Sequence, residues 1–292
     1  MTKQPIADLH YASRGAGQMR TLLGLLLVTL WSCVGNLVCA EERFFESSGG
    51  RLRYLLEGEG EPVLLLHGFA EDSETGWERS GVIDELTKVQ FKIVAVDLLG
   101  HGGSARSHDL KDYGVSMANE VIALMDALKL SQVHGVGYSM GAALMSKLLE
   151  LHPDRFLSAT LSGYGEPPLP NDVNDELVQE IRKNLNRMNL LEGNDPRALA
   201  NLSVGWREWR VAKSSLQRNQ IPVLALIGAE DIFLPDTRRL VQSLATSRLL
   251  VIPGDHGSAR SRPEYYSALV DFLNQHRDPD VDDRAAKKEG VE

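Results

Sequence analysis

One short stretch of the chain has the residue types and spacing that suit nucleophilic catalysis. Ser139 lies at the centre of Gly137-Tyr138-Ser139-Met140-Gly141, which follows an apolar run at 133–136 and precedes an apolar stretch at helical spacing. A strand, a tight turn and a helix in this order would lift the serine hydroxyl clear of a sheet and aim it at the N-terminus of the helix. Small residues on both sides of the serine permit such a turn. We therefore predict that Ser139 is a nucleophile rather than the N-cap of the following helix.

A serine hydroxyl becomes a good nucleophile when a base accepts its proton, and histidine, whose pKa is near neutrality, suits that role. His256 follows the last predicted strand and Asp231 follows the strand before it, so the chain order is serine, acid, histidine. A carboxylate next to the imidazole would fix its tautomer and stabilise the imidazolium. We predict Asp231 in that role, with Glu230 and Asp236 as rival acids near the same strand end.

Attack on a carbonyl forms a tetrahedral oxyanion, which needs two backbone N–H donors. Met140, directly after the serine, would provide one, and Phe69, which follows a His-Gly pair, would provide the other. We predict that His67 of that pair braces the loop and does no chemistry itself. Asp97 and Gly100-His101-Gly102 are predicted to shape a turn rather than to contact substrate.

These residues need elements that bring them to one place. Alternating strand and helix patterns with fully apolar strands predict an α/β fold, a mostly parallel sheet covered on both faces. A hairpin is predicted at 43–57, and further strands at 63–66, 91–96, 133–136, 156–162, 222–227 and 248–252. Helices are predicted within 71–90 from about residue 78, at 115–128, from the serine to about 152, at 235–244 and at 263–275. Carboxyl ends of parallel strands meet at one edge, so Ser139, Asp231 and His256 should meet there.

Residues 163–220 interrupt this alternation. Prolines cluster near the start of the segment, and two amphipathic helices are predicted at 175–191 and 195–215. We interpret the segment as a helical cap over the carboxyl edge of the sheet. Trp206 and Trp209 lie three residues apart on the second helix, and we predict that both pack in the core rather than line a pocket.

Taken together, these stretches resemble the landmarks of the α/β-hydrolase superfamily, in its serine-nucleophile branch of esterases, lipases and carbon–carbon bond hydrolases. The resemblance runs from about residue 44 to 276 and rests on the stretches at 66–69, 97–104, 137–141, 228–231 and 254–256. It implies an eight-stranded sheet, a covalent acyl-enzyme intermediate and no cofactor. The serine separates the chain from the similar dehalogenases and epoxide hydrolases, which have an aspartate there. Two features depart from the family pattern. Ala142 stands where a third glycine is frequent, and the loop at His-Gly-Phe is short. The short loop argues against activity on the bulky esters that lipases cleave.

The composition fits one large globular domain and excludes several classes of partner. The chain has 292 residues, of which 43% are hydrophobic, and a net charge of -9, so we expect no nucleic-acid partner. Both cysteines, Cys33 and Cys39, precede the predicted domain, which leaves that domain without a disulfide or a cysteine nucleophile. The sequence has no metal-binding spacing such as His-Glu-x-x-His, so no metal is expected.

The apolar segment before the domain predicts export to the periplasm or the cell exterior. Residues 1–40 are interpreted as a signal peptide cleaved at its end, with a membrane anchor at 21–38 or lipid attachment at Cys33 as alternatives. The hydrolase domain is predicted at 41–277, and the charged residues 278–292 are predicted to be disordered.

The sequence therefore predicts a hydrolase of carboxylic esters or related acyl compounds, acting on a small-molecule substrate. The same residues would serve carbon–carbon bond hydrolysis, acyl transfer or perhydrolysis, so these reactions stay as alternatives. A ligand-binding sensor with little turnover and a tethered surface protein are alternatives of another class. The sequence assigns no substrate-binding residue and no oligomeric state.

Overall fold

The computed structural model describes residues 41–191 and 193–278. The predicted leader at 1–40 and residues 279–292 of the predicted charged tail lie outside these ranges, so both remain predictions. Within the described ranges, no helix combines the length and the apolar character needed to cross a bilayer.

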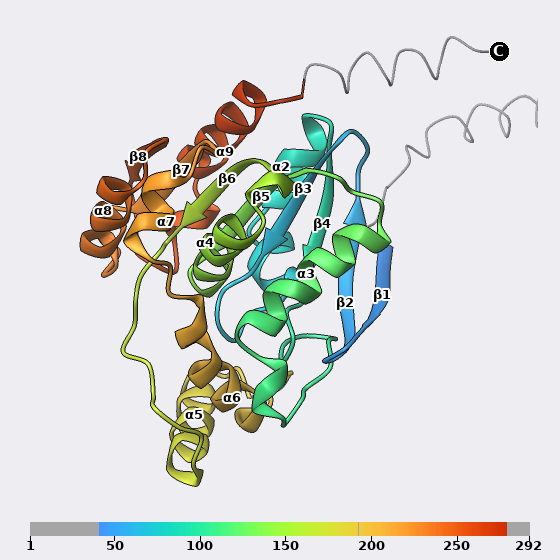
Figure 1. The fold of residues 1–292 in the computed structure, drawn as a ribbon, viewed down its shortest axis with the longest axis vertical. Coiled ribbons are helices and arrows are strands. Elements are labelled where there is room, and N and C mark those ends of the chain that lie inside the picture. The colour runs from blue at the N-terminus through green and yellow to red at the C-terminus, as the bar shows by residue number, and fades with distance from the viewer. Residues whose placement is uncertain (1–40, 192, 279–292) are drawn as a thin grey trace, which may run out of the picture. The chain divides into compact units, whose positions relative to one another are not determined.

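An eight-stranded sheet runs through the described domain in the order β1-β2-β4-β3-β5-β6-β7-β8 (Figure 1). β1 pairs antiparallel with β2, and β2 with β4, whereas the other neighbouring strands are parallel. The strands are β1 Glu41–Ser47, β2 Gly50–Glu57, β3 Glu61–Leu66, β4 Phe91–Val96, β5 Val133–Tyr138, β6 Phe156–Ser162, β7 Val223–Gly228 and β8 Ser247–Ile252. The predicted mostly parallel sheet is confirmed.

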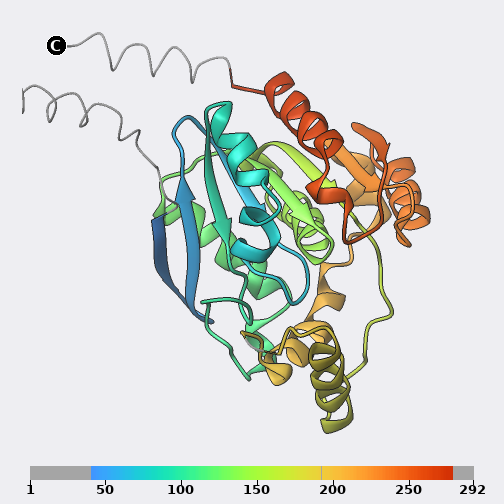
Figure 2. The same ribbon diagram turned by 180° about the vertical axis from the view of Figure 1, so that it is seen from behind.

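The inner strands form because their side chains are apolar on both faces. Four consecutive residues of β3, from Val63 to Leu66, are each exposed by 1% or less. Such a strand is stable only when helices cover both faces of the sheet. α3 and α4 cover one face and α2 and α9 cover the other (Figures 1 and 2). The helices that flank the sheet are α2 Val82–Lys88, α3 Val115–Ala127, α4 Met140–Leu151, α8 Leu234–Ser243 and α9 Pro263–Gln275.

The helix predicted within 71–90 is shorter and starts later than expected. A π-helical turn, η1 at Glu74–Glu78, comes first, and α2 begins only at Val82. Gly81 separates them with a φ of 78°, a left-handed conformation that interrupts the helical path. The irregular turn leaves the Trp77 side chain fully buried. Short 3-10 turns elsewhere in the domain include η2 Leu110–Asp112, η3 Pro153–Arg155 and η5 Ala259–Ser261.

The segment between β6 and β7 contains α5 Asp175–Arg187, α6 Pro196–Gly205, the 3-10 turn η4 Trp206–Trp209 and α7 Lys213–Arg218. α5 and α6 lie apart from the helices that cover the sheet (Figure 1). The single helix predicted at 195–215 is wrong, because α6 ends at Gly205. A Cβ on Gly205 would lie 2.8 Å from the Gly114 nitrogen, and Trp209 Nε1 donates to Gly114 O over 2.7 Å. These contacts with the loop before α3 fix the chain in a tighter turn.

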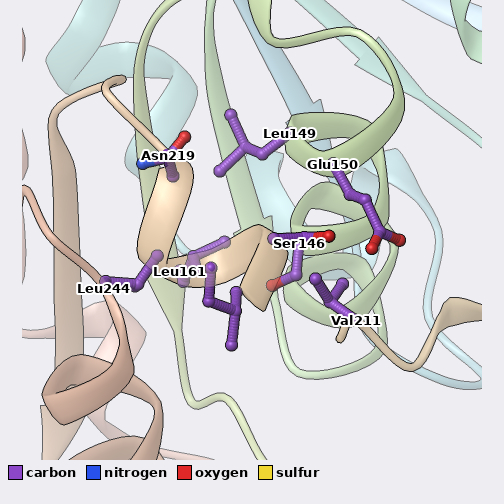
Figure 3. A pocket seen from close by; sticks show the side chains of 9 residues that line it. Ser146, Leu149, Glu150, Leu161, Val211, Asn219 and Leu244 are labelled. Atoms are coloured by element: carbon purple, nitrogen blue, oxygen red, sulfur yellow. The ribbon is translucent and has the colours of Figure 1, made fainter. Parts of the chain in front are cut away.

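A small pocket lies where the segment returns to the sheet, between α4, α7 and β6 (Figure 3). Ser146 and Leu149 of α4, Leu161 of β6 and Asn219 after α7 line a cavity of about 10 Å³. This is room for one water molecule at most. The pocket is therefore too small for a substrate, and the candidate site lies elsewhere.

Candidate active site

Ser139 occupies a strained turn between β5 and α4. Its φ is 53°, in the left-handed region that residues other than glycine rarely adopt. The flanking glycines permit this turn, because a Cβ on Gly137 would lie 2.3 Å from Gly141 O, and a Cβ on Gly141 would lie 2.1 Å from Leu66 O. Ser139 stands at the N-cap position of α4, but its side chain makes no capping hydrogen bond to the helix, so the hydroxyl is not used as a cap.

The side chains of Ser139, His256 and Asp231 form a continuous hydrogen-bonded chain. Ser139 Oγ lies 3.0 Å from His256 Nε2, and His256 Nδ1 lies 2.8 Å from Asp231 Oδ2. The Asp231 side chain is fully buried, whereas the imidazole is 34% exposed. Because a carboxylate can only accept, the proton of the neutral imidazole belongs on Nδ1, which leaves Nε2 able to accept the serine proton. The arrangement can therefore serve general-base catalysis at the hydroxyl.

The two rival acids are engaged elsewhere. Glu230 Oε2 accepts a hydrogen bond from the Gly254 backbone, over 2.8 Å. Asp236 lies in α8, where it forms an ion pair with Arg239 and accepts from the Glu166 backbone. Asp231 also accepts from the Phe233 backbone through Oδ1, which holds the carboxylate in place for the imidazole.

Two contacts that sequence reasoning missed fix the position of His256. The Tyr138 hydroxyl donates to His256 O over 2.6 Å. Burial raises the pKa of Tyr138, so this hydroxyl keeps its proton at neutral pH. Gly163 follows β6 and leaves room for the ring, because a Cβ there would lie 3.2 Å from His256 Cε1. The available sequence signals were a tyrosine inside the serine motif and a glycine directly after a strand.

The backbone N–H groups of Phe69 and Met140 are available for an oxyanion. Met140 begins α4 directly after Ser139, and Phe69 lines the same pocket as Ser139. Neither N–H donates to another described residue, whereas the N–H groups of Gly68 and Ala70 donate to Glu71 and His101 side chains. The free donors are thus the two that the sequence predicts.

Two buried histidines hold the loop that carries Phe69. His67 Nδ1 donates to Gly68 O over 2.8 Å, and His67 Nε2 accepts from the Leu98 backbone over 2.9 Å. Because a peptide unit is planar, fixing Gly68 O also fixes the direction of the Phe69 N–H. His101 Nε2 accepts from the Ala70 backbone, and burial lowers the pKa of His101 to about 3, so the ring stays neutral. His67 therefore braces the loop, as predicted.

Asp97 shapes the neighbouring turn, also as predicted. Its buried carboxylate accepts from the backbone N–H groups of Ser73 and Gly103, each over 2.8 Å. Arg53 on β2 pairs with the same carboxylate over 2.9 Å. The Asp97 side chain therefore ties β4 to β2 and to the loops on either side.

A pocket of about 530 Å³ opens at Ser139. The sequence assigned no residue to it, because its walls come mostly from the cap segment. Its apolar lining consists of Phe69, Pro167, Pro168, Leu169, Pro170, Leu177, Ile181, Trp206 and Phe233, and its polar lining of Ser139, Glu180, Asn184 and Ser203. Trp206 packs in the core, as predicted, with its ring centroid 5.8 Å from that of Trp209, but it also lines the pocket, which the prediction did not include. Trp209 is buried in the core, as predicted.

Sequence reasoning also missed Glu71 and Arg260. Their side chains form a paired hydrogen bond of 2.8 and 2.9 Å next to the loop that carries Phe69. They are 189 residues apart, and no local pattern marks either of them. Among the described residues, no cluster of three or more His, Cys, Asp or Glu side chains is suited to a metal ion.

Comparisons with known proteins agree with this fold. A family profile described as alpha/beta hydrolase fold matches residues 61–190. The chain is 27% identical over 137 residues to Bifunctional epoxide hydrolase 2 of Sus scrofa, an alignment that covers 47% of this chain but only 24% of that protein. It is 26% identical over 262 residues to the dihydrolipoyllysine-residue acetyltransferase component of the acetoin cleaving system of Pseudomonas putida, covering 78% of this chain and 68% of the relative.

Among solved structures, an esterase from Exiguobacterium antarcticum is similar with a TM-score of 0.69. The match covers 80% of this chain and 100% of the esterase chain at 20% identity, and so it supports the fold alone. The matched profile, the eight-stranded sheet and the strand-turn-helix that holds Ser139 agree with one another. The chain therefore has the α/β-hydrolase fold.

Proposed function

We propose that the protein is a serine hydrolase that cleaves carboxylic esters through an acyl-enzyme intermediate. The observation that carries the proposal is the hydrogen-bonded chain from Ser139 through His256 to Asp231, which faces a pocket of about 530 Å³. A pocket of this volume accommodates a small molecule, and its largely apolar walls favour an uncharged acyl or alcohol group.

In the first half-reaction, Ser139 Oγ attacks the ester carbonyl while His256 Nε2 accepts its proton. Asp231 stabilises the imidazolium, and the N–H groups of Phe69 and Met140 donate to the oxyanion. Collapse of the tetrahedral intermediate expels the alcohol, which takes the proton from His256. Water then attacks the acyl-enzyme with His256 as base, which releases the acid and restores the serine hydroxyl.

The charge of the pocket disfavours anionic substrates. Glu180 on α5 is the one charged side chain among the described residues that line it, and none of those residues is basic. A carboxylate on the substrate would meet no cation in this pocket and would be repelled by Glu180. The proposed substrate is therefore a neutral or cationic ester of an apolar acid.

Hydrolysis of p-nitrophenyl butyrate tests the proposal. We expect turnover by the wild type, loss of at least about a thousandfold in kcat for Ser139→Ala, and covalent labelling of the wild type alone by a fluorophosphonate. Ser203→Ala is the matched control, because Ser203 lines the same pocket while its hydroxyl donates to Leu199 O in the same helix. Equal activity of Ser139→Ala and the wild type would refute the mechanism.

Product analysis separates hydrolysis from the alternatives. In buffer that contains methanol or hydrogen peroxide, a hydrolase yields mainly the free acid, whereas an acyltransferase or perhydrolase yields mainly the methyl ester or the peracid. A sensor would react with the fluorophosphonate but would release no more than about one equivalent of p-nitrophenol per protein molecule. We expect free acid and many turnovers.

A further inference from the structure

We propose that the ion pair of Glu71 and Arg260 positions the oxyanion loop, residues 67–71, for catalysis. This inference rests on the proposed function, because it assigns the pair a role in the same reaction. Arg260 Nη1 and Nη2 donate to the two carboxylate oxygens of Glu71 over 2.9 and 2.8 Å. The arginine side chain is 8% exposed and the glutamate side chain 29% exposed, so the pair is largely removed from water.

The glutamate end of the pair holds the oxyanion loop directly. Glu71 Oε2 accepts from the N–H of Gly68, the residue immediately before Phe69, over 3.0 Å. The contact is tight, because a Cβ on Gly68 would lie 2.9 Å from Glu71 Oε2 and 3.7 Å from Ser139 Cβ. A displaced carboxylate would therefore displace the Gly68–Phe69 peptide, whose N–H is the predicted oxyanion donor.

The arginine end joins the same loop to the other two parts of the site. Arg260 lies in η5, four residues after His256. Its guanidinium carbon lies 4.2 Å from the ring centroid of Tyr138, the residue before Ser139. The Tyr138 hydroxyl in turn donates to His256 O. The Arg260 guanidinium therefore contacts the turn that holds Ser139, lies close to the loop that holds His256 and, through Glu71, is joined to the oxyanion loop.

The charges of the pair have a role of their own. A lone carboxylate beside Gly68 would oppose the negative charge that develops on the oxyanion, and the guanidinium cancels that effect. Burying an ion pair does not by itself stabilise a fold. Arg260 Nε is also buried with no hydrogen-bond partner in the described part of the chain. A costly pair next to the reacting groups therefore favours a positioning role over a purely stabilising one.

Four variants test this role: Glu71→Gln, Arg260→Met, Arg260→Lys and the double variant Glu71→Gln/Arg260→Met. Loss of one oxyanion donor typically lowers kcat by a hundredfold or more. We expect kcat for p-nitrophenyl butyrate to fall about a hundredfold in Arg260→Met and about tenfold in Glu71→Gln, with KM within about twofold of the wild type. The double variant should be faster than Arg260→Met, because it no longer holds an uncompensated carboxylate. Arg260→Lys should recover part of the activity.

An alkyl boronic acid reads the oxyanion site without turnover, because its tetrahedral adduct on Ser139 carries a negative oxygen. Its inhibition constant should rise by about the same factor as kcat/KM falls in each variant. Arg155→Met is the matched control. Arg155 pairs with Asp126 over 2.7 Å at a position remote from the site, so its loss should change Tm but neither kcat nor boronate affinity.

Each outcome decides one question. If folded Arg260→Met and Glu71→Gln keep wild-type kcat and boronate affinity, the pair is only structural and the inference is overturned. A double variant slower than Arg260→Met also overturns it, since the charge argument then fails. If Arg260→Met does not fold, Glu71→Gln and Arg260→Lys carry the comparison. A wild type that neither hydrolyses esters nor reacts with the fluorophosphonate refutes the proposed function instead, and the inference with it.

Discussion

The imidazole of His256 keeps its place partly because Gly163 has no side chain. Gly163 has a φ of 54°, and a Cβ there would lie 3.2 Å from His256 Cε1, 3.3 Å from His256 Nδ1 and 3.3 Å from Tyr138 Cζ. Contacts this short force a neighbour to move by a few tenths of an ångström. The neighbour that moves is the general base of the proposed reaction, so a small packing change becomes a catalytic one.

We expect Gly163→Ala to lower kcat for p-nitrophenyl butyrate about tenfold, because the displaced ring loses alignment with the Ser139 hydroxyl. Gly193→Ala is the control. Gly193 also has a positive φ, 87°, but a Cβ there would meet no described atom within 4 Å. Both variants should lose about 1 kcal/mol of unfolding free energy from left-handed strain, so urea unfolding should match while kcat differs. Equal kcat values for the two variants would contradict the argument.

At this scale, sequence reasoning succeeds where a residue has a local signature. Ser139 lies in a five-residue motif, and Asp231 and His256 follow strands whose ends share one edge. Glu71 and Arg260 have no such signature, because their partnership exists only after residues 189 apart have been brought together. Gly163 could be recognised as a strand-end glycine, but the ring that it accommodates could not.

Among the elements, α5 decides which molecules the pocket admits. Leu177, Ile181, Glu180 and Asn184 of this helix all line the pocket at Ser139. Their spacing of three and four residues places them on one side of the helix. The same helix thus supplies both an apolar wall and the one charged side chain of the described lining.

Two esters of similar size test the charge of this wall, p-nitrophenyl butyrate and the p-nitrophenyl monoester of succinic acid. At low salt we expect kcat/KM to be about fivefold higher for the neutral ester, a modest factor because Glu180 is exposed. Glu180→Gln should narrow the difference, and so should higher ionic strength. Glu176→Gln, one turn earlier on α5 and outside the pocket lining, should leave it unchanged. If Glu180→Gln kept the wild-type ratio of kcat/KM for the two esters, Glu180 would not be the source of the charge preference.

The elements differ in how far sequence predicts them. Inner strands such as β4 and β6 match the expected residues, because uninterrupted apolar runs have few other structures open to them. The ends of the cap helices are less predictable, because a tertiary contact ends α6 and a local left-handed residue follows α5. α6 stops at Gly205 against Gly114, and α5 ends at Arg187 before Asn189 adopts a φ of 55°. Neither event follows from helical periodicity alone.

The stability of the whole domain should depend on pH through His101. Burial lowers the pKa of His101 to about 3 in the folded protein, against about 6.5 in an unfolded chain. Between these values the unfolded chain binds a proton that the folded chain does not, so stability falls as the pH decreases. From pH 6.5 to pH 4 the expected loss from this residue is about 3 kcal/mol, at ~1.4 kcal/mol for each unit.

Urea unfolding at pH 6.5, 5 and 4 tests this expectation. The His101→Gln variant should be less stable than the wild type at pH 6.5, because the acceptor for the Ala70 N–H is altered. Its unfolding free energy should then decrease less steeply with falling pH. Parallel curves for the two proteins would show that His101 does not control acid sensitivity.

Processing of the N-terminus is a separate question at this scale. We propose that the protein is exported and that its leader is removed after Ala40. The proposal rests on the sequence, in which an apolar run is followed by Val38 and Ala40, the small residues expected before such a cut. Mass spectrometry of the exported protein should therefore find Glu41 at the N-terminus. An intact Met1, or a lipid on Cys33, would favour one of the two anchored alternatives.

The cap segment divides the reacting groups along the chain. Ser139 and Phe69 precede α5, α6 and α7, whereas Asp231 and His256 follow them. If the polypeptide were produced as two separate pieces, divided near Gly193, neither piece would contain both the nucleophile and the base. Ester cleavage would then appear only when the halves reassociate, which makes this domain a natural template for a split-enzyme complementation reporter.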